Sequence, residues 1–559
     1  MPPTTTQRAG RRLTRRAALR PDRLLTQAAL HAAANEPAPP AGLRTSGGSG
    51  ASPEGGAPAL PPLGIIVLNR LAFGPRPGDL AAFNALGGSD DARLTAWVDW
   101  QLNPGAIFDT DCDNRISAAG FTTLNKPLTQ LWADHYVGSA GRTIPLTDVR
   151  NAALIRAVYS QRQLFEVLTD FWHNHFNIFA WDYSYASATW VHYDRDVIRA
   201  NALGNFRQFL QAVATSTAML YYLDNYINQV AGFNENWARE LFELHTLGAE
   251  NYLGVMNPLD VPVDGGGLAI GYCDNDVYES ARAFTGWRVN NGSSSAPGND
   301  GTFYYHDTWH DKANKLVLAQ YLPAFQNQME DGNDVLDLMA THPGTARHIA
   351  RKLCRRLISD DPPQTVVDAA AAEFQAHVNS GDQLKRVVRV ICLSPEFKAA
   401  WGEKVKRPFE AAAGMLRAMQ AEFTPTNDFF YTFDAAGQPL FSRRSPDGYP
   451  DHKDEWANTT SLLQRWRLAN QLVQGYIDNT QLNLLAQMPG GVTTSNQIVD
   501  FWIDRLLGRP MDPPENRTEI LNFLAQGFNP DFDLPSSQLT ARLPHMVALL
   551  LMSPDFQWR

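Results

Sequence analysis

The chain of 559 residues lacks long apolar runs and has few cysteines. No stretch of about 18 consecutive apolar residues occurs, so we expect no transmembrane segment. The four cysteines are Cys112, Cys273, Cys354 and Cys392, and none form a Cys-x-x-Cys metal or redox motif. Their spacing leaves the number of disulfides open. The net charge of −10 argues against a general nucleic-acid-binding protein.

Several motifs of common enzyme classes are also missing. The sequence has no Gly-x-Ser-x-Gly elbow, no Walker loop, no dinucleotide fingerprint in a strand–helix context and no His-Glu-x-x-His zinc signature. These absences argue against α/β-hydrolases with a serine nucleophile, P-loop nucleotidases, Rossmann dehydrogenases and zincin proteases.

The N-terminal segment 1–60 differs from the rest of the chain, because it is basic and rich in Pro, Gly, Ser and Ala. Arg11–Leu19 resembles a twin-arginine export signal, followed by a low-complexity linker from Pro37 to Pro62. Charged residues between 20 and 23 interrupt the apolar region that such a signal needs. Two interpretations follow: export to the periplasm or the extracellular space, or a disordered basic tail on a cytoplasmic protein.

Residues 61–559 show mainly helical periodicity, with few strand signals. We therefore predict a mainly α, multi-helical fold with few short strands and long loops. One loop near 288–302 is rich in Gly, Ser and Asn, which indicates a mobile segment. A second irregular segment, near 423–456, reads as a long loop or surface insertion.

The segment 234–248, NENWARELFELHTLG, is the most informative part of the sequence. It predicts a helix with Asn236, Glu240 and Glu243 on one face and Arg239 at its edge, while apolar residues cover most of the rest. Such a helix is usually buried, so its two carboxylates must be paired, bound to a metal or exposed to a cavity. The structural alternative is an internal Arg239–Glu243 pair.

A second group of titratable residues lies in the segment 171–176, FWHNHF. In a helix, His175 shares the apolar face of Phe171, while His173 lies about opposite, near Asp170. Two such histidines cannot chelate one ion from a regular helix, although they can from an extended segment. Glu240-x-x-Glu243 resembles half of a carboxylate metal site. A divalent metal held by His173, His175, Glu240 and Glu243 is therefore one candidate cofactor arrangement.

Two further segments combine charges that suit a ligand. His310, Asp311 and Lys315 place a titratable histidine, a carboxylate and a cation after a predicted strand, where the alternative is a solvated turn. The predicted helix that begins at Pro343 carries a basic stripe on one side. That stripe can bind an anionic ligand or pair with carboxylates of neighbouring helices.

Taken together, several motifs resemble a large bacterial family, the domain of unknown function 1800. They run in family order from about residue 63 to the end, which implies one family-length module. The matching segments are 68–75 (LNRLAFGP), 171–176 (FWHNHF), 234–248, 281–287 (ARAFTGW), His310-Asp311 with Lys315, 342–346 (HPGTA), 406–410 (KRPFE) and 553–557 (SPDFQ).

The resemblance implies an exported protein, often encoded beside a second exported family related to sulfatases and phosphatases, the domain of unknown function 1501. Our first hypothesis is a hydrolase or lyase acting on a polysaccharide. Its catalytic residues would be Glu240, Glu243, His175 or His173, and His310 with Asp311. Its ligand would be held by Asn236, Arg239, Arg282, Trp287 and Lys315. The second hypothesis is a non-catalytic exported scaffold or binding protein that works with such a neighbouring enzyme.

Overall fold

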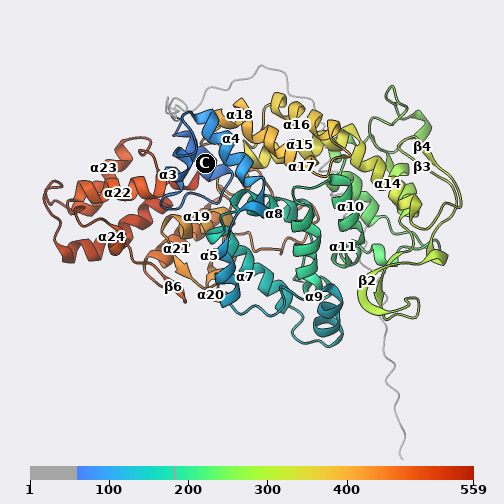
Figure 1. Cartoon of the computed structure of the whole chain (residues 1–559), viewed down its shortest axis with the longest axis horizontal. Coiled ribbons are helices and arrows are strands. Elements are labelled where there is room, and N and C mark those ends of the chain that lie inside the picture. Colours follow the sequence, from blue (N-terminus) through green and yellow to red (C-terminus); the bar gives the residue numbers. More distant parts are fainter. Residues whose placement is uncertain (1–59, 182–183) are drawn as a thin grey trace, which may run out of the picture. The chain divides into compact units, whose positions relative to one another are not determined.

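The computed structural model describes residues 60–181 and 184–559. The predicted export signal and most of the predicted linker lie outside the described residues. Helices dominate the described part, which confirms the mainly α prediction (Figure 1). None of its helices is long and apolar enough to cross a membrane.

The first half of the described chain contains the helices that carry the 171–176 and 234–248 segments. In order they are α2 Leu63–Arg70, α3 Asp79–Asn84, α4 Asp90–Gln101, α5 Thr110–Ala118, α6 Leu128–Leu131, α7 Ile144–Tyr159, α8 Gln163–His175, α9 Ser184–His192, α10 Phe206–Thr215, α11 Thr217–Tyr222, α12 Asn236–Glu240 and α13 Asp274–Ala283. Three π-helical turns interrupt this half: η3 Trp132–Val137, η4 Tyr193–Arg199 and η6 Leu241–His245.

Helices also make up most of the second half. They are α14 Glu330–Thr341, α15 Pro343–Leu357, α16 Gln364–Ala376, α17 Gln383–Leu393, α18 Pro395–Ala399, α19 Pro408–Ala418, α20 Asn427–Asp434, α21 Thr459–Val473, α22 Ser495–Leu507, α23 Glu515–Ala525, α24 Ser536–Met552 and α25 Pro554–Gln557.

The strands of the described part form three small antiparallel sheets. They pair β1 Trp287–Asn291 with β2 Asn299–Tyr305, β3 Lys315–Val317 with β4 Gln320–Leu322, and β5 Glu422–Phe423 with β6 Thr480–Gln481. Most of the segment near 288–302, where we expected a loop, is therefore a hairpin, and only its turn at 292–298 is irregular. The segment near 423–456 contains α20 and the short 3₁₀ turn η10 Lys453–Glu455 but otherwise remains irregular, as its lack of periodicity indicated.

Local sequence signals explain where α15 begins and ends. Pro343 occupies the first turn, where its missing N–H costs nothing, and the Nδ1 atom of His342 accepts a hydrogen bond from the Gly344 N–H at 2.9 Å. The helix ends before Asp361-Pro362-Pro363, which cannot continue it. α15 then packs with α16 and α17, as Figure 1 shows.

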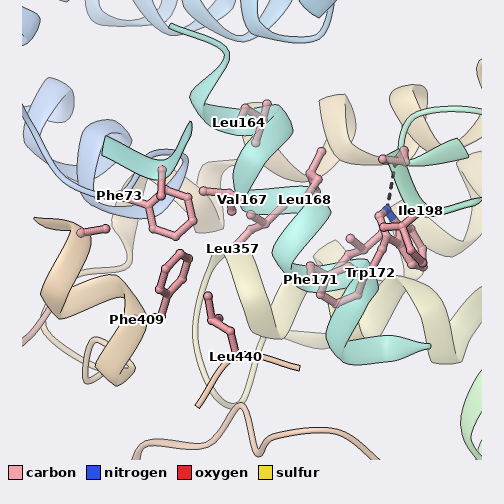
Figure 2. Close-up of a cluster of buried hydrophobic side chains, with 14 of the residues drawn as sticks. Phe73, Leu164, Val167, Leu168, Phe171, Trp172, Ile198, Leu357, Phe409 and Leu440 are labelled. Atoms are coloured by element: carbon pink, nitrogen blue, oxygen red, sulfur yellow. Dashed lines mark hydrogen bonds between the residues drawn. The ribbon is translucent and has the colours of Figure 1, made fainter. Parts of the chain in front are cut away.

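One continuous hydrophobic core joins these elements. α8 lies within it, and its residues Leu164, Leu168, Phe171 and Trp172 are almost fully buried (Figure 2). The indole N–H of Trp172 donates to the carbonyl of Ala202 at 3.0 Å, so its one polar atom is satisfied. Because α8 is fixed by this packing, the histidines at its C-terminal end have defined positions.

The four cysteines lie in this core as unpaired, buried side chains. The sequence left disulfides open, and the structure contains none between these residues. Burial raises the pKa of Cys354 to about 12, which keeps its thiol protonated and unreactive near neutral pH.

Candidate functional site

The segment that we predicted as one regular helix changes its geometry in the middle. α12 ends at Glu240, and the chain continues as the π turn η6, where the Thr246 hydroxyl donates to the Leu241 carbonyl at 2.5 Å. Trp237, Leu241 and Phe242 are buried, as the apolar pattern predicted. Single π turns inside helices occur often at functional sites.

Glu240 is the last residue of α12 and Glu243 lies on the turn η6; both are half-buried. Neither carboxylate has a hydrogen bond or an ion pair with any residue in the described part of the chain. Burial raises the pKa of Glu240 to about 7, and the charge of Glu243 raises it further. A carboxyl group with this pKa exchanges its proton near neutral pH, as a general acid or base must.

Arg239 does not neutralise Glu243, although the sequence allowed an internal pair. Its guanidinium instead lies 3.0 Å from Glu235 and 3.5 Å from Asp274, on the more exposed side. Asn236 is exposed, and its backbone N–H donates to the Asn234 side chain at 3.0 Å. The two carboxylates at 240 and 243 are therefore left unpaired by their own helix.

The structure separates the two histidines of α8, as helical geometry predicted. The Nε2 atom of His173 lies 2.9 Å from Asp194, which also accepts from Arg199 at 3.0 Å. His175 points the other way and stacks on Phe171, with ring centroids 6.1 Å apart. His173 is thus a member of a buried ion network and has no contact with Glu240 or Glu243.

His175 belongs to a group of three imidazoles that the sequence did not identify as a site. Its ring centroid is 6.0 Å from His245 of η6 and 6.4 Å from His348 of α15. The Nε2 atom of His175 is 3.2 Å from the His245 carbonyl, which identifies Nε2 as the protonated nitrogen. His175 Nδ1 and both ring nitrogens of His245 are buried without a hydrogen-bond partner among the described residues.

Burial keeps the imidazoles of His175 and His245 neutral. It lowers the pKa of His245 to about 3, and the nearby Lys352 and His348 lower it further. Burial and the charge of Lys352 also lower the pKa of His175 well below its usual value. His348 instead pairs with Glu250 at 3.1 Å. Spacing could not reveal this group, because its members come from three distant segments.

A loop from the segment near 423–456 packs against the C-terminal end of α8. The Asn174 side chain forms two hydrogen bonds with the backbone of Tyr449, at 2.8 and 2.7 Å, and Asn177 donates to two further loop carbonyls. The loop carries Asp447, whose charge acts on both Glu240 and Lys352. We call Glu240 and Glu243 the Glu240 site, and include with them the histidine group of His175, His245 and Lys352, to which the charge of Asp447 links them.

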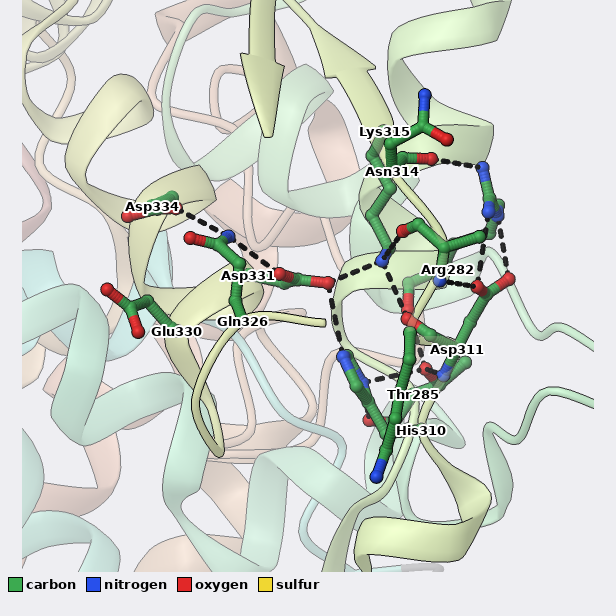
Figure 3. Close-up of polar contacts among 12 residues, drawn as sticks. Arg282, Thr285, His310, Asp311, Asn314, Lys315, Gln326, Glu330, Asp331 and Asp334 are labelled. Atoms are coloured by element: carbon green, nitrogen blue, oxygen red, sulfur yellow. Dashed lines mark hydrogen bonds and ion pairs between the residues drawn. The ribbon is translucent and has the colours of Figure 1, made fainter. Parts of the chain in front are cut away.

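The other predicted residues lie in a separate group, shown in Figure 3. Arg282 binds Asp311 through two hydrogen bonds of 2.8 and 3.1 Å, and His310 Nε2 lies 3.1 Å from Asp331. Lys315 pairs with Asp331 and also donates to the carbonyls of residues 311 and 313. We call Arg282, His310, Asp311, Lys315 and Asp331 the Asp331 cluster.

Trp287 lies at the start of β1, next to the Asp331 cluster in sequence, but it is fully buried. Its ring packs edge-on against Phe284 and Phe303, at centroid distances of 5.3 and 5.4 Å. In this position the indole supports the hairpin and has no surface for a ligand.

The predicted metal ligands are not brought together. Within residues 60–181 and 184–559, no group of three or more His, Cys, Asp or Glu side chains is arranged to hold a metal ion. His173 lies on the opposite side of α8 from His175, and no contact joins either histidine to Glu240 or Glu243. What the structure shows instead is a carboxyl group with a raised pKa, Glu240, and a separate group of buried imidazoles around His175.

The comparisons with known proteins give a family and no more. A family model described as "Protein of unknown function (DUF1800)" matches residues 66–558, nearly all of the described chain. No curated protein and no solved structure matches the sequence.

Proposed function

This chain belongs to the DUF1800 family, and we propose that it is an exported hydrolase or lyase that cleaves a polysaccharide at the Glu240 site. The proposal rests mainly on one observation: Glu240 and Glu243 are half-buried, three residues apart and without a partner among the described residues. A partly buried carboxyl group with a raised pKa and no hydrogen-bond partner is typical of functional sites.

Cleavage of a glycosidic bond uses two carboxyl groups in different protonation states. One is protonated and donates to the leaving oxygen, and the other is ionised and acts as base or nucleophile. Glu240, with its pKa raised to about 7 by burial and by Glu243, suits the role of the acid. Glu243 is then the second carboxyl group; its charge adds to the effect of burial, which is the larger cause of the raised pKa of Glu240.

The imidazoles of the site have a supporting role. The proton of His175 is on Nε2, where it donates to a carbonyl, so Nδ1 is an unprotonated acceptor without a partner. His245 remains neutral because burial lowers its pKa. Because His175 and His245 are almost fully buried, they do not reach a substrate; His175 supports the turn η6 from the core side, through its hydrogen bond to the His245 carbonyl.

The test is release of reducing ends from a panel of purified polysaccharides, including xylan, chitin and peptidoglycan. We expect wild-type activity that falls above about pH 7, as Glu240 loses its proton, and a loss of about 10²–10⁴-fold in Glu240→Gln or Glu243→Gln. Glu235→Gln on the same helix is the matched control and should retain full activity. Full activity of Glu240→Gln, or no product from any polysaccharide, would refute the proposal.

A second candidate function is a non-catalytic exported scaffold for an enzyme of the sulfatase and phosphatase type. The observation in its favour is that the charged side chains of the Asp331 cluster pair with one another and leave no free group for a substrate. A scaffold would bind its partner equally well with Glu240→Gln and Glu243→Gln. This candidate would be favoured if these variants co-purified with the exported protein of the domain of unknown function 1501 family and neither they nor the wild type cleaved any polysaccharide.

A further inference from the structure

A cavity of about 370 Å³ lies apart from the Glu240 site, between α2, α3, α4, the turn before α8, and α19. Its volume is within the range of small-molecule sites. Most of the wall is apolar and comes from Leu68, Phe83, Leu86, Trp97 and Trp100. Leu86 and Trp100 are each about two-fifths exposed, which places them at the mouth.

Polar groups gather at one end of this cavity. Arg417 is buried, and its guanidinium donates to Asp79 at 3.0 Å and to the carbonyls of Gly74 and Val158. Asp79 also accepts the backbone N–H of Arg76 at 2.9 Å. Asp79 and the donors of Arg417 are therefore already engaged inside the fold.

The side chain of Arg76 is different. Its Nη1 atom donates to the Tyr159 carbonyl at 3.2 Å, and its Nε atom is 3.8 Å from Asp79, too far for a hydrogen bond. Neither Nε nor Nη2 forms a hydrogen bond with any residue in the described part of the chain. Arg76 thus has donors to offer to a molecule in the cavity.

The charge balance at this end of the cavity favours an anion. Two arginines, Arg76 and Arg417, share one carboxylate, Asp79. Burial lowers the pKa of Arg417 to about 9; the charge of Asp79 opposes this shift, and the charge of Arg76 adds to it. One further negative charge beside Arg76 would balance the group.

We propose that this cavity is a binding site for a small monocarboxylate with an apolar body. The carboxylate would take the Nε and Nη2 donors of Arg76, and the aliphatic or aromatic body would lie against Phe83, Trp97 and Trp100. Arginine suits this role because its planar fork matches the two oxygens of a carboxylate. Two other polar side chains of the wall, Gln101 and Gln163, do not compete, since they already bond backbone groups.

The test compares two probes of equal length, octanoate and 1-octanol, by isothermal titration calorimetry of the full chain at low ionic strength. We expect octanoate to bind at least tenfold more tightly. Arg76→Gln should lower the affinity for octanoate about tenfold and leave octanol unchanged. Arg386→Gln, which removes an exposed arginine on α17, is the matched control and should change neither affinity.

A second variant tests the cavity itself. Ala82 lines the cavity from an exposed position on α3, so Ala82→Trp can fill the space without removing a buried contact. We expect this variant to lose both probes while its melting temperature stays near that of the wild type. Equal wild-type affinities for octanoate and octanol, an unchanged octanoate affinity in Arg76→Gln, or full octanoate binding by Ala82→Trp would each overturn the proposal.

Discussion

The Glu240 site and the Asp331 cluster contain the same kinds of side chain, but these side chains are paired in the Asp331 cluster and largely unpaired in the Glu240 site. In the Asp331 cluster each carboxylate faces a cation, and Lys315 has three oxygen partners. In the Glu240 site two carboxylates and three imidazole nitrogens lack partners within the described residues. A motif rich in titratable residues therefore does not identify a reactive site; the groups left unsatisfied do.

The two groups also differ in how their pKa values move. Burial alone would raise the pKa of Asp331, but hydrogen bonds from His310 and Lys315 outweigh it and lower the pKa. At Glu240 no hydrogen bond opposes burial; the charge of Arg239 lowers the pKa, but burial and the charge of Glu243 outweigh it, and the pKa rises. The first pattern stabilises a fold, whereas the second holds a proton available near neutral pH.

The largest expected effect is on the stability of the Asp331 cluster. Asp331→Asn leaves Lys315 fully buried without its counter-charge, and we expect a loss of about 3–5 kcal/mol in the free energy of unfolding. Urea unfolding at pH 7 measures it. Asp334→Asn, one turn later on α14 and without an ion pair, is the control and should lose much less. A loss below about 1 kcal/mol in Asp331→Asn would contradict the contrast between the two regions.

At the Glu240 site we expect a smaller effect of opposite sign: a substitution that raises the free energy of unfolding. The folded-state pKa of Glu240 is about 7, above the unfolded value of 4.5, so wild-type stability falls as the pH rises from about 4.5 to above 7. Glu240→Gln cannot lose a proton and breaks no internal contact. We expect it to be more stable than the wild type at pH 8, by on the order of 2 kcal/mol, and about equal at pH 4.

Urea unfolding of both proteins at pH 4, 6 and 8 gives this difference directly. Glu235→Gln serves as the control, because Glu235 is exposed and its change should not depend on pH in this range. If Glu240→Gln were less stable than the wild type at pH 8, Glu240 would have a favourable partner in the native state, and the comparison would fail.

The smallest effect is expected at Arg239, which the sequence placed beside the carboxylates. Its two ion pairs are with Glu235 and Asp274 and are well exposed to solvent. Arg239→Gln should therefore change the free energy of unfolding by less than about 1 kcal/mol. Thermal or urea unfolding measures this change. A larger loss would contradict the prediction and show that Arg239 stabilises the turn η6 by more than its two exposed ion pairs.

Local patterns in the sequence predicted much of the fold and part of the site. α8 and α15 follow from helical periodicity and the position of Pro343, and the opposite orientation of His173 and His175 follows from helix geometry. The pattern also identified Glu240 and Glu243 as unusual. α13 begins at Asp274, and the Asp276 carboxylate accepts a hydrogen bond from the backbone N–H of Cys273.

What the sequence could not give were contacts between distant segments. His245 and His348 join His175 only because η6 and α15 pack on the end of α8. The loop that carries Asp447 has no periodicity, so it read as an insertion, although Asn174 and Asn177 hold it against α8. Likewise, His310 and Asp311 resembled a site until Asp331 and Arg282 supplied their partners.

The π turn η6 has a consequence for anyone who tries to transfer this motif to another helix. A π turn contains one residue more than the α-helical turn that it replaces, so everything after it is rotated by about 100° relative to a straight helix. Grafting residues 236–245 onto an ordinary helix would keep Glu240 in place and carry His245 to another side. Deleting Leu244 should do the same within this chain, because it removes one residue from the turn and changes the orientation of His245 relative to Glu240, while both carboxylates and all three imidazoles remain present.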